Sequence, residues 1–114
     1  MQYMLLIYSD EDANDLSPEG MALWAAFNAE FADNIKAGDA LQPAATATTV
    51  RTRDGKVLMT DGPFAETKEQ LGGYYLVECE NLDEALAMAA KVPLANQGSI
   101  EVRPLIDWEN LPST

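Results

Sequence analysis

Apolar residues along this chain fall into short runs, and the first run predicts a strand. The six residues from Tyr3 to Tyr8 are all apolar or aromatic, and a polar segment from Ser9 to Asp15 follows them. A run of this length without polar positions is typical of a strand that is covered on both faces. We therefore expect a buried strand at the start of the chain and a solvated acidic loop after it.

Apolar positions spaced by three or four residues predict two helices. The first is expected to begin after the cap Ser17 and to end at Gly38. The second is expected to begin at a capping box formed by Asn81 and Glu84 and to stop before Pro93. The apolar faces predicted for them are Trp24, Phe27, Phe31 and Ile35 in the first helix and Ala85, Leu86, Ala89 and Val92 in the second.

Residues 45–53 and 56–60 predict a β-hairpin because Asp54-Gly55 joins two alternating segments. In the register of a two-residue turn, Arg53 lies opposite Lys56. The same register pairs Arg51 with Leu58 and Val50 with Met59. Three cations thus gather at one end of the hairpin, where we expect them to be solvated and to deter edge pairing. An anion site is the alternative interpretation.

Two more strands are predicted in the second half of the chain. Residues 73–79 form one strand, and Gly72-Gly73 indicates a bulge at its start. Residues 99–106 form the last strand, in which Pro104 indicates an edge or a strand end. In this last strand Ile100 and Val102 share one face, and Glu101 and Arg103 share the other.

The order of these elements predicts an α+β fold in a single domain that spans residues 1–114. This order is strand, helix, hairpin, strand, helix, strand. It is compatible with a ferredoxin-like antiparallel sheet that carries both helices on one face. The other face would then be open, although the first strand is apolar on both sides. A homodimer that pairs face to face would cover this apolar surface, so we expect a homodimer.

The charge balance narrows the classes of partner. Seven Lys and Arg against nineteen Asp and Glu give a formal net charge of -12. Such a chain has no basic face for phosphates, so direct nucleic-acid binding and binding to anionic membranes are disfavoured. The N-terminal segment carries no basic residue and only a short apolar run, so neither a signal peptide nor a membrane span is predicted. We expect a cytoplasmic protein.

Few residue types for acid–base or metal chemistry are available. The chain has no histidine, which removes histidine-based triads and the usual imidazole zinc ligands. Cys79 is the only cysteine, and its place in a strand predicts a buried, inert thiol. Asp10, Asp12 and Asn14 match the first ligand positions of a calcium loop. That loop requires Gly where Asp15 stands and Glu where Met21 stands, so we predict no metal site, and no cofactor fingerprint is present.

The stretch from Asp61 to Tyr75 is the one segment that strand and helix patterns leave unexplained. Its start, Asp61-Gly62-Pro63, has the composition of a turn. Glu66, Lys68 and Glu69 follow, and such a group of charges either is solvated or belongs to a site. Both interpretations stay open for Asp61 and Glu66.

At Asp61-Gly62-Pro63-Phe64 the chain resembles the YCII-related, or DGPF-domain, proteins, which are named after this tetrapeptide. The resemblance spans almost the whole chain, since several separated segments agree in order and spacing. The supporting segments are residues 3–8, Thr49-Val50-Arg51, residues 61–75, Leu82-Asp83-Glu84-Ala85 and residues 98–104.

The resemblance implies a dimeric α+β barrel built by two ferredoxin-like subunits, with a small cavity in each. The biochemical role of this family is mostly unassigned. Some relatives in the wider group carry a histidine–aspartate pair suggested to be catalytic, and this chain departs from them because it has no histidine. Members of the DGPF branch also often accompany extracytoplasmic-function sigma factors, which implies regulation.

Two functional hypotheses follow, and whether the protein is an enzyme is left open. The first is a cavity that binds, and in one version converts, a small acidic metabolite, with Asp61 and Glu66 as candidate catalytic carboxylates. The second is a regulatory or interaction protein associated with such sigma factors, whose acidic surface meets a basic partner. The ligand-binding candidates of the first hypothesis are Arg103, Glu101, Lys68, Tyr74 and Trp24.

Overall fold

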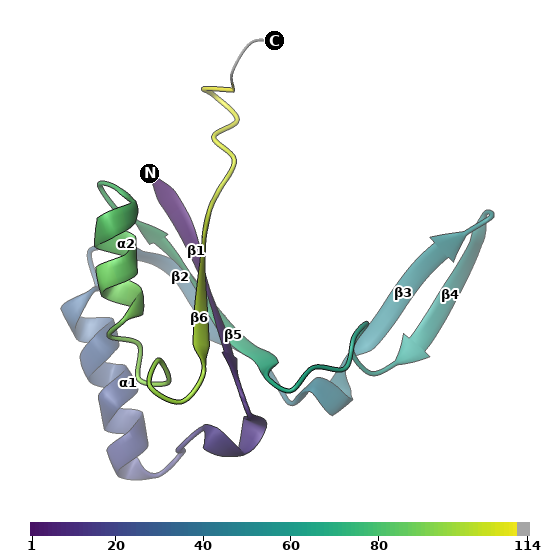
Figure 1. Cartoon of the computed structure of the whole chain (residues 1–114), viewed down its shortest axis with the longest axis horizontal. Coiled ribbons are helices and arrows are strands. Elements are labelled where there is room, and N and C mark those ends of the chain that lie inside the picture. The colour runs from purple at the N-terminus through teal and green to yellow at the C-terminus, as the bar shows by residue number, and fades with distance from the viewer. Residues whose placement is uncertain (112–114) are drawn as a thin grey trace.

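The computed structural model describes residues 1–111 of the chain. Its six strands and two helices follow one another in the order that Figure 1 shows. Two short 3-10 turns, η1 (Glu11–Ala13) and η2 (Ala44–Thr46), lie between them. The elements are β1 (Gln2–Ser9), α1 (Pro18–Glu30), β2 (Ile35–Ala40), β3 (Thr48–Arg53), β4 (Lys56–Asp61), β5 (Gln70–Glu78), α2 (Leu82–Ala89) and β6 (Ser99–Pro104).

The strands form two separate antiparallel sheets. The larger sheet has the order β2-β5-β1-β6, and the smaller one is the β3-β4 hairpin. Both helices lie on one face of the larger sheet, and the opposite face is uncovered in the single chain (Figure 1). This strand order with two helices on one face confirms the predicted α+β, ferredoxin-like subunit.

Strand β1 lies inside the sheet because its residues are apolar on both faces. Tyr3, Leu5 and Ile7 point toward the helices and are at most 4% exposed. Met4, Leu6 and Tyr8 point to the uncovered face and are half-buried. The core beneath the helices also contains Phe27, Val77, Cys79, Ala85, Met88, Ala89, Val92 and Leu94.

The prediction that the first helix continues to Gly38 is wrong. The cap is as expected, since the Ser17 hydroxyl accepts a hydrogen bond from the Gly20 N–H at 3.2 Å, but α1 ends at Glu30. Residues Ile35–Ala40 form β2 instead and pair with β5 through the backbone. Gly38 is therefore a strand residue, and it lies under the ring of Tyr75: a Cβ there would be 2.6 Å from Tyr75 Cδ1.

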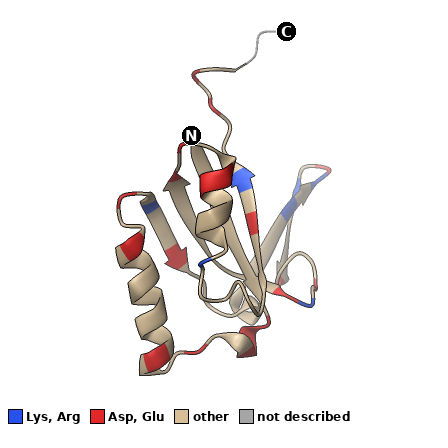
Figure 2. Cartoon of the chain, turned by 60° about the vertical axis from the view of Figure 1, so that its left-hand side comes forward, with Lys and Arg blue, Asp and Glu red and all other residues tan. Residues whose placement is uncertain are grey.

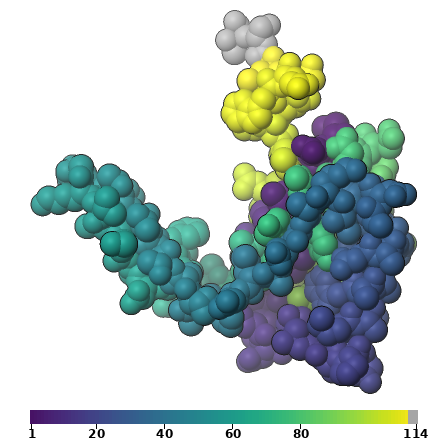
Figure 3. All heavy atoms as spheres, turned by 180° about the vertical axis from the view of Figure 1, so that it is seen from behind, coloured from purple at the N-terminus to yellow at the C-terminus, as the bar shows by residue number. Residues whose placement is uncertain are grey.

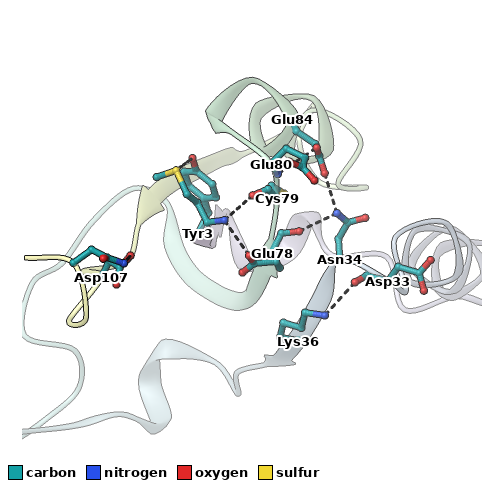
Figure 4. A network of polar contacts seen from close by, with 11 residues as sticks. Tyr3, Asp33, Asn34, Lys36, Glu78, Cys79, Glu80, Glu84 and Asp107 are labelled. Carbon is teal, nitrogen blue, oxygen red and sulfur yellow. Dashed lines mark hydrogen bonds and ion pairs between the residues drawn. The ribbon is translucent and has the colours of Figure 1, made fainter.

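The second helix has the predicted cap but a different buried face. Asn81 Oδ1 accepts a hydrogen bond from the Glu84 N–H at 2.9 Å. The Glu84 carboxylate accepts from the Glu80 N–H at 3.3 Å and from Asn34 Nδ2 at 3.1 Å, so it does not return to Asn81 (Figure 4). Met88 is buried in place of the predicted Leu86, which is 46% exposed.

The register of the hairpin and the bulge of β5 are as predicted. Val50 pairs with Met59, Arg51 with Leu58 and Arg53 with Lys56. In β5, Gly72 is skipped between the pairs Ile7–Gly73 and Tyr8–Leu71. Strand β6, with Pro104 at its end, is an edge of the sheet.

The β3-β4 hairpin projects from the rest of the chain, and we call it the arm (residues 48–61). It leaves the large sheet on the side opposite the helices (Figure 1), and open space separates it from the main body (Figure 3). The radius of gyration is 16.5 Å, whereas about 13 Å is usual for a compact domain of this length. The projecting arm and residues 105–111 account for this extended shape (Figure 1). Among residues 1–111, no helix combines the length and apolar character needed to cross a membrane.

Candidate functional site

A cavity of about 570 Å³ lies between α1 and the end of the large sheet. Its walls come from the end of β1 and the loop after it, one side of α1, the end of β2 and the segment after it, and the start of β5. This volume is within the range of pockets that hold small organic molecules. The cavity is therefore the candidate site.

The inner wall of the cavity is built around Tyr75 and Asn28. The Tyr75 hydroxyl donates a hydrogen bond to Asn28 Oδ1 at 2.6 Å and so connects β5 to α1. Its ring packs on Phe27 with the two ring centroids 5.2 Å apart. Gly38 has no side chain, and this leaves the space that the Tyr75 ring occupies.

The Tyr75 phenol stays protonated at neutral pH. Burial raises the pKa of this group above its ordinary value of 10.0. Because its proton is already donated to Asn28, the hydroxyl oxygen is left as a hydrogen-bond acceptor. Tyr75 is thus suited to bind and position a ligand and unsuited to remove a proton from one.

The remaining walls are mainly apolar, and two contacts fix their shape. Trp24 packs against the core and also lines the cavity, so it has both roles considered for a tryptophan on this helix. Across the cavity, Glu11 Oε1 accepts a hydrogen bond from the Ala44 N–H at 2.7 Å. This bond ties the loop after β1 to the segment after β2. The other apolar lining residues include Met21, Leu41 and Leu71.

The charge of the lining does not suit an acidic ligand. Two carboxylate residues, Glu11 and Asp39, are among the lining residues, whereas no Lys or Arg of the described chain is. An anion in this cavity would approach like charges without a cation to pair with, which costs free energy.

Two of the five predicted ligand-binding residues line the cavity, and three do not. Trp24 and Tyr74 are lining residues. Glu101 and Arg103 are exposed on β6, where they pair with Leu6 and Met4, so they lie on the uncovered face of the sheet. Lys68 is exposed in the segment between β4 and β5. A ligand role for these three residues stays a prediction.

The candidate catalytic carboxylates Asp61 and Glu66 are both exposed and lie outside the cavity lining. Asp61 ends β4 opposite Thr48. The turn after it has Gly62 at φ 97°, with its N–H bonded to the Ala47 carbonyl at 2.7 Å. This geometry confirms the turn interpretation of the tripeptide, and a catalytic role for either carboxylate stays a prediction.

Sequence reasoning missed two residues of this wall: Tyr75, since the candidate on β5 was its neighbour Tyr74, and Asn28. Asn28 lies four positions after Trp24 on α1, so both side chains belong to one side of the helix. This side of the helix was expected to face the core. A polar amide beside Trp24 on such a side is a signal that could have indicated a cavity.

The one cysteine of the chain, Cys79, is not among the residues that line the cavity. Cys79 is 3% exposed, as predicted, and its pKa is raised by burial first and by the nearby Glu84 carboxylate second. A protonated, buried thiol is a poor nucleophile. Within the described residues no group of three His, Cys, Asp or Glu side chains is arranged to hold a metal ion.

Comparison with known proteins gives relatives over the full length. An uncharacterised protein of Rhizobium meliloti (strain 1021) is 40% identical, with 99% of this chain and 100% of the relative covered. Among solved structures, the 5-chloro-2-hydroxyhydroquinone dehydrochlorinase of Burkholderia phenoliruptrix AC1100, in complex with 2,5-dihydroxybenzoquinone, has a TM-score of 0.60 at 14% identity. That match covers 96% of this chain and 97% of the other, and it shows that the two share a fold. The family model of the YCII-related domain matches residues 1–109, and the chain therefore belongs to the YCII-related family.

Proposed function

We propose that the cavity between α1 and the sheet binds a small, oxygen-bearing ring compound without net negative charge. The observation that carries this proposal is the Tyr75–Asn28 pair in the wall of a mainly apolar cavity. The Tyr75 oxygen can accept a hydrogen bond from a ligand hydroxyl, and the Asn28 amide N–H can donate one to a ligand oxygen. The indole of Trp24 offers a flat apolar surface.

The size of the ligand is supported by a protein of the same fold. The dehydrochlorinase described above holds 2,5-dihydroxybenzoquinone, a six-membered ring with oxygen substituents. The acidic metabolite expected from the sequence is less well supported, because the lining residues include carboxylates and no cation. We therefore propose a neutral ligand in its place.

Binding is better supported than conversion. No histidine is available, and the Tyr75 proton is held by Asn28. The alternative, a regulatory partner of a sigma factor, has no comparable support, because neither relative described above is named as one.

The assembly that we propose is a homodimer in which two uncovered sheet faces meet and form an α+β barrel. Met4, Leu6 and Tyr8 of β1 and Tyr74 and Leu76 of β5 are only half-buried in the single chain. A contiguous apolar face of this kind is rarely left in water. Pairing of two copies would bury it, including Tyr74, which also lines the cavity.

A binding titration with hydroquinone (1,4-dihydroxybenzene), which is uncharged at neutral pH, as the probe tests the cavity. Trp108 lies 74% exposed outside the cavity. In a Trp108→Phe background the fluorescence therefore reports on Trp24 alone. We expect quenching that saturates, and about a tenfold weaker affinity for Asn28→Ala because one hydrogen bond is lost.

Arg103→Ala is the matched control, since it removes a polar side chain from the uncovered sheet face. Its affinity should equal that of the parent protein. Loss of binding in Arg103→Ala with unchanged binding in Asn28→Ala would move the site to the sheet face and contradict the proposal. Absence of saturable quenching by hydroquinone and by the other neutral dihydroxybenzenes would contradict the ligand class.

A further inference from the structure

The arm has two chemically different faces. In the β3-β4 register, residues that pair across the strands share a face, so Val50, Met59 and Val57 lie together on one side. The other side carries the pairs Arg51–Leu58 and Arg53–Lys56. The arm is therefore an amphipathic hairpin with an apolar face and a basic face.

The apolar face of the arm has no cover among residues 1–111. Val50 is 60%, Val57 62% and Met59 72% exposed. Open space separates the arm from the body of the molecule (Figure 3). A two-stranded hairpin alone is marginally stable in water and needs a further layer to be stable. A surface that packs on Val50, Val57 and Met59 is thus required to hold the arm in place.

The charge of the arm is opposite to that of the rest of the chain. The arm carries three cations and two carboxylates, so its net charge is +1. Because the whole chain has a net charge of -12, the residues outside the arm together carry -13. The Lys and Arg positions on its strands, blue in Figure 2, stand apart from the mainly acidic body. A second copy of this chain is therefore a complementary partner for the arm, whereas two acidic bodies repel each other.

We propose that the arm of one copy docks through Val50, Val57 and Met59 on the body of a second copy and so clasps the dimer. The proposal rests on the face-to-face dimer proposed above. The arm rises on the same side as the uncovered sheet face (Figure 1), and the space between the two is open (Figure 3). A partner sheet that packs on the uncovered face would enter this space and come within reach of the arm.

Sedimentation equilibrium of two matched variants tests the clasp. Met59→Asp places a charge on the apolar face of the arm, and Thr60→Asp places the same charge one residue later on the opposite face. Each dimer contains two arms, so we expect the dissociation constant to rise about a hundredfold for Met59→Asp. Thr60→Asp should change it less than about tenfold, since surface charges contribute little.

The outcomes distinguish the docking of the arm, which we call the clasp, from the face-to-face dimer itself. A wild-type dimer that both variants leave equally intact would overturn the clasp and keep the face-to-face dimer. A wild-type monomer at all concentrations would overturn both. Far-UV circular dichroism of the variants checks that the body is folded, which we expect because the arm lies outside the core. Co-elution of the whole chain with a different protein, without self-association of the chain, would also overturn the proposal.

Discussion

The helix-covered side of the sheet and the arm contain the same types of residue in opposite environments. Val77 is fully buried under the helices, whereas Val57 in the arm is 62% exposed. Met88 is 2% exposed and Met59 72%. The helix-covered core is therefore complete within one chain, and the arm is an element whose partner lies outside it. Substitutions in the two regions should differ both in size and in their dependence on protein concentration.

The largest expected effect is in the body. Leu5→Ala removes a fully buried side chain at the centre of the sheet, so it should lower the free energy of unfolding by about 3 kcal/mol. Val57→Ala in the arm should lower it by less than about 0.5 kcal/mol at low protein concentration. Urea unfolding of both variants measures the difference. Equal losses at low concentration would show that the arm is part of the core.

A smaller loss of stability is expected for Gly38→Ala, which tests how Tyr75 packs in the cavity wall. In Gly38→Ala the new Cβ would lie 2.6 Å from Tyr75 Cδ1 and 2.9 Å from the Tyr74 carbonyl oxygen. Either the ring or the strand must move, which should cost about 2 kcal/mol and weaken ligand binding. Gly72→Ala is the matched control, because its Cβ would meet only the Ile7 carbonyl oxygen, at 4.0 Å. Thermal unfolding and the probe titration of both variants check this, and an unperturbed Gly38→Ala protein would refute the packing described for Tyr75.

The smallest effect concerns the Tyr75 hydroxyl. Tyr75→Phe removes the hydrogen bond to Asn28 and should lower the free energy of unfolding by about 1 kcal/mol at neutral pH. The folded pKa of Tyr75 is raised above 10.0. The stability it contributes is therefore present below pH 10 and falls as the pH rises from the unfolded pKa toward the folded one.

Urea unfolding of Tyr75→Phe and of the parent protein from pH 8 to 11 tests this direction. The parent protein should lose stability more steeply above pH 10 than the variant. Tyr74→Phe, a neighbouring tyrosine on the other face of β5, is the control and should follow the parent. A steeper alkaline loss in Tyr75→Phe would contradict the raised pKa.

Features that depend on neighbouring residues were predictable from the sequence. The hairpin register follows from Asp54 and Gly55, which both adopt positive φ, 52° and 76°. The Ser17 and Asn81 caps and the central place of β1 also follow from local composition. The turn at Asp61-Gly62-Pro63 has the same origin.

Strand β2 and the cavity were not predictable because they depend on contacts between distant segments. Residues Ile35–Ala40 are mostly exposed, so they show no strand periodicity, and only backbone pairing with β5 makes them a strand. The Tyr75–Asn28 hydrogen bond joins residues 47 positions apart. The cavity therefore exists only once α1 has packed on the sheet, and charged residues such as Glu66 drew attention away from it.

Hydrogen exchange at two protein concentrations tests most directly whether the body is complete in one chain and the arm is completed by a second. We expect amides of β1 and β5 to be protected already in dilute solution, because their hydrogen bonds lie within the single chain. Amides of β3 and β4 should exchange rapidly in dilute solution and slowly once dimers form. Protection of the arm that is the same at every concentration would contradict this account.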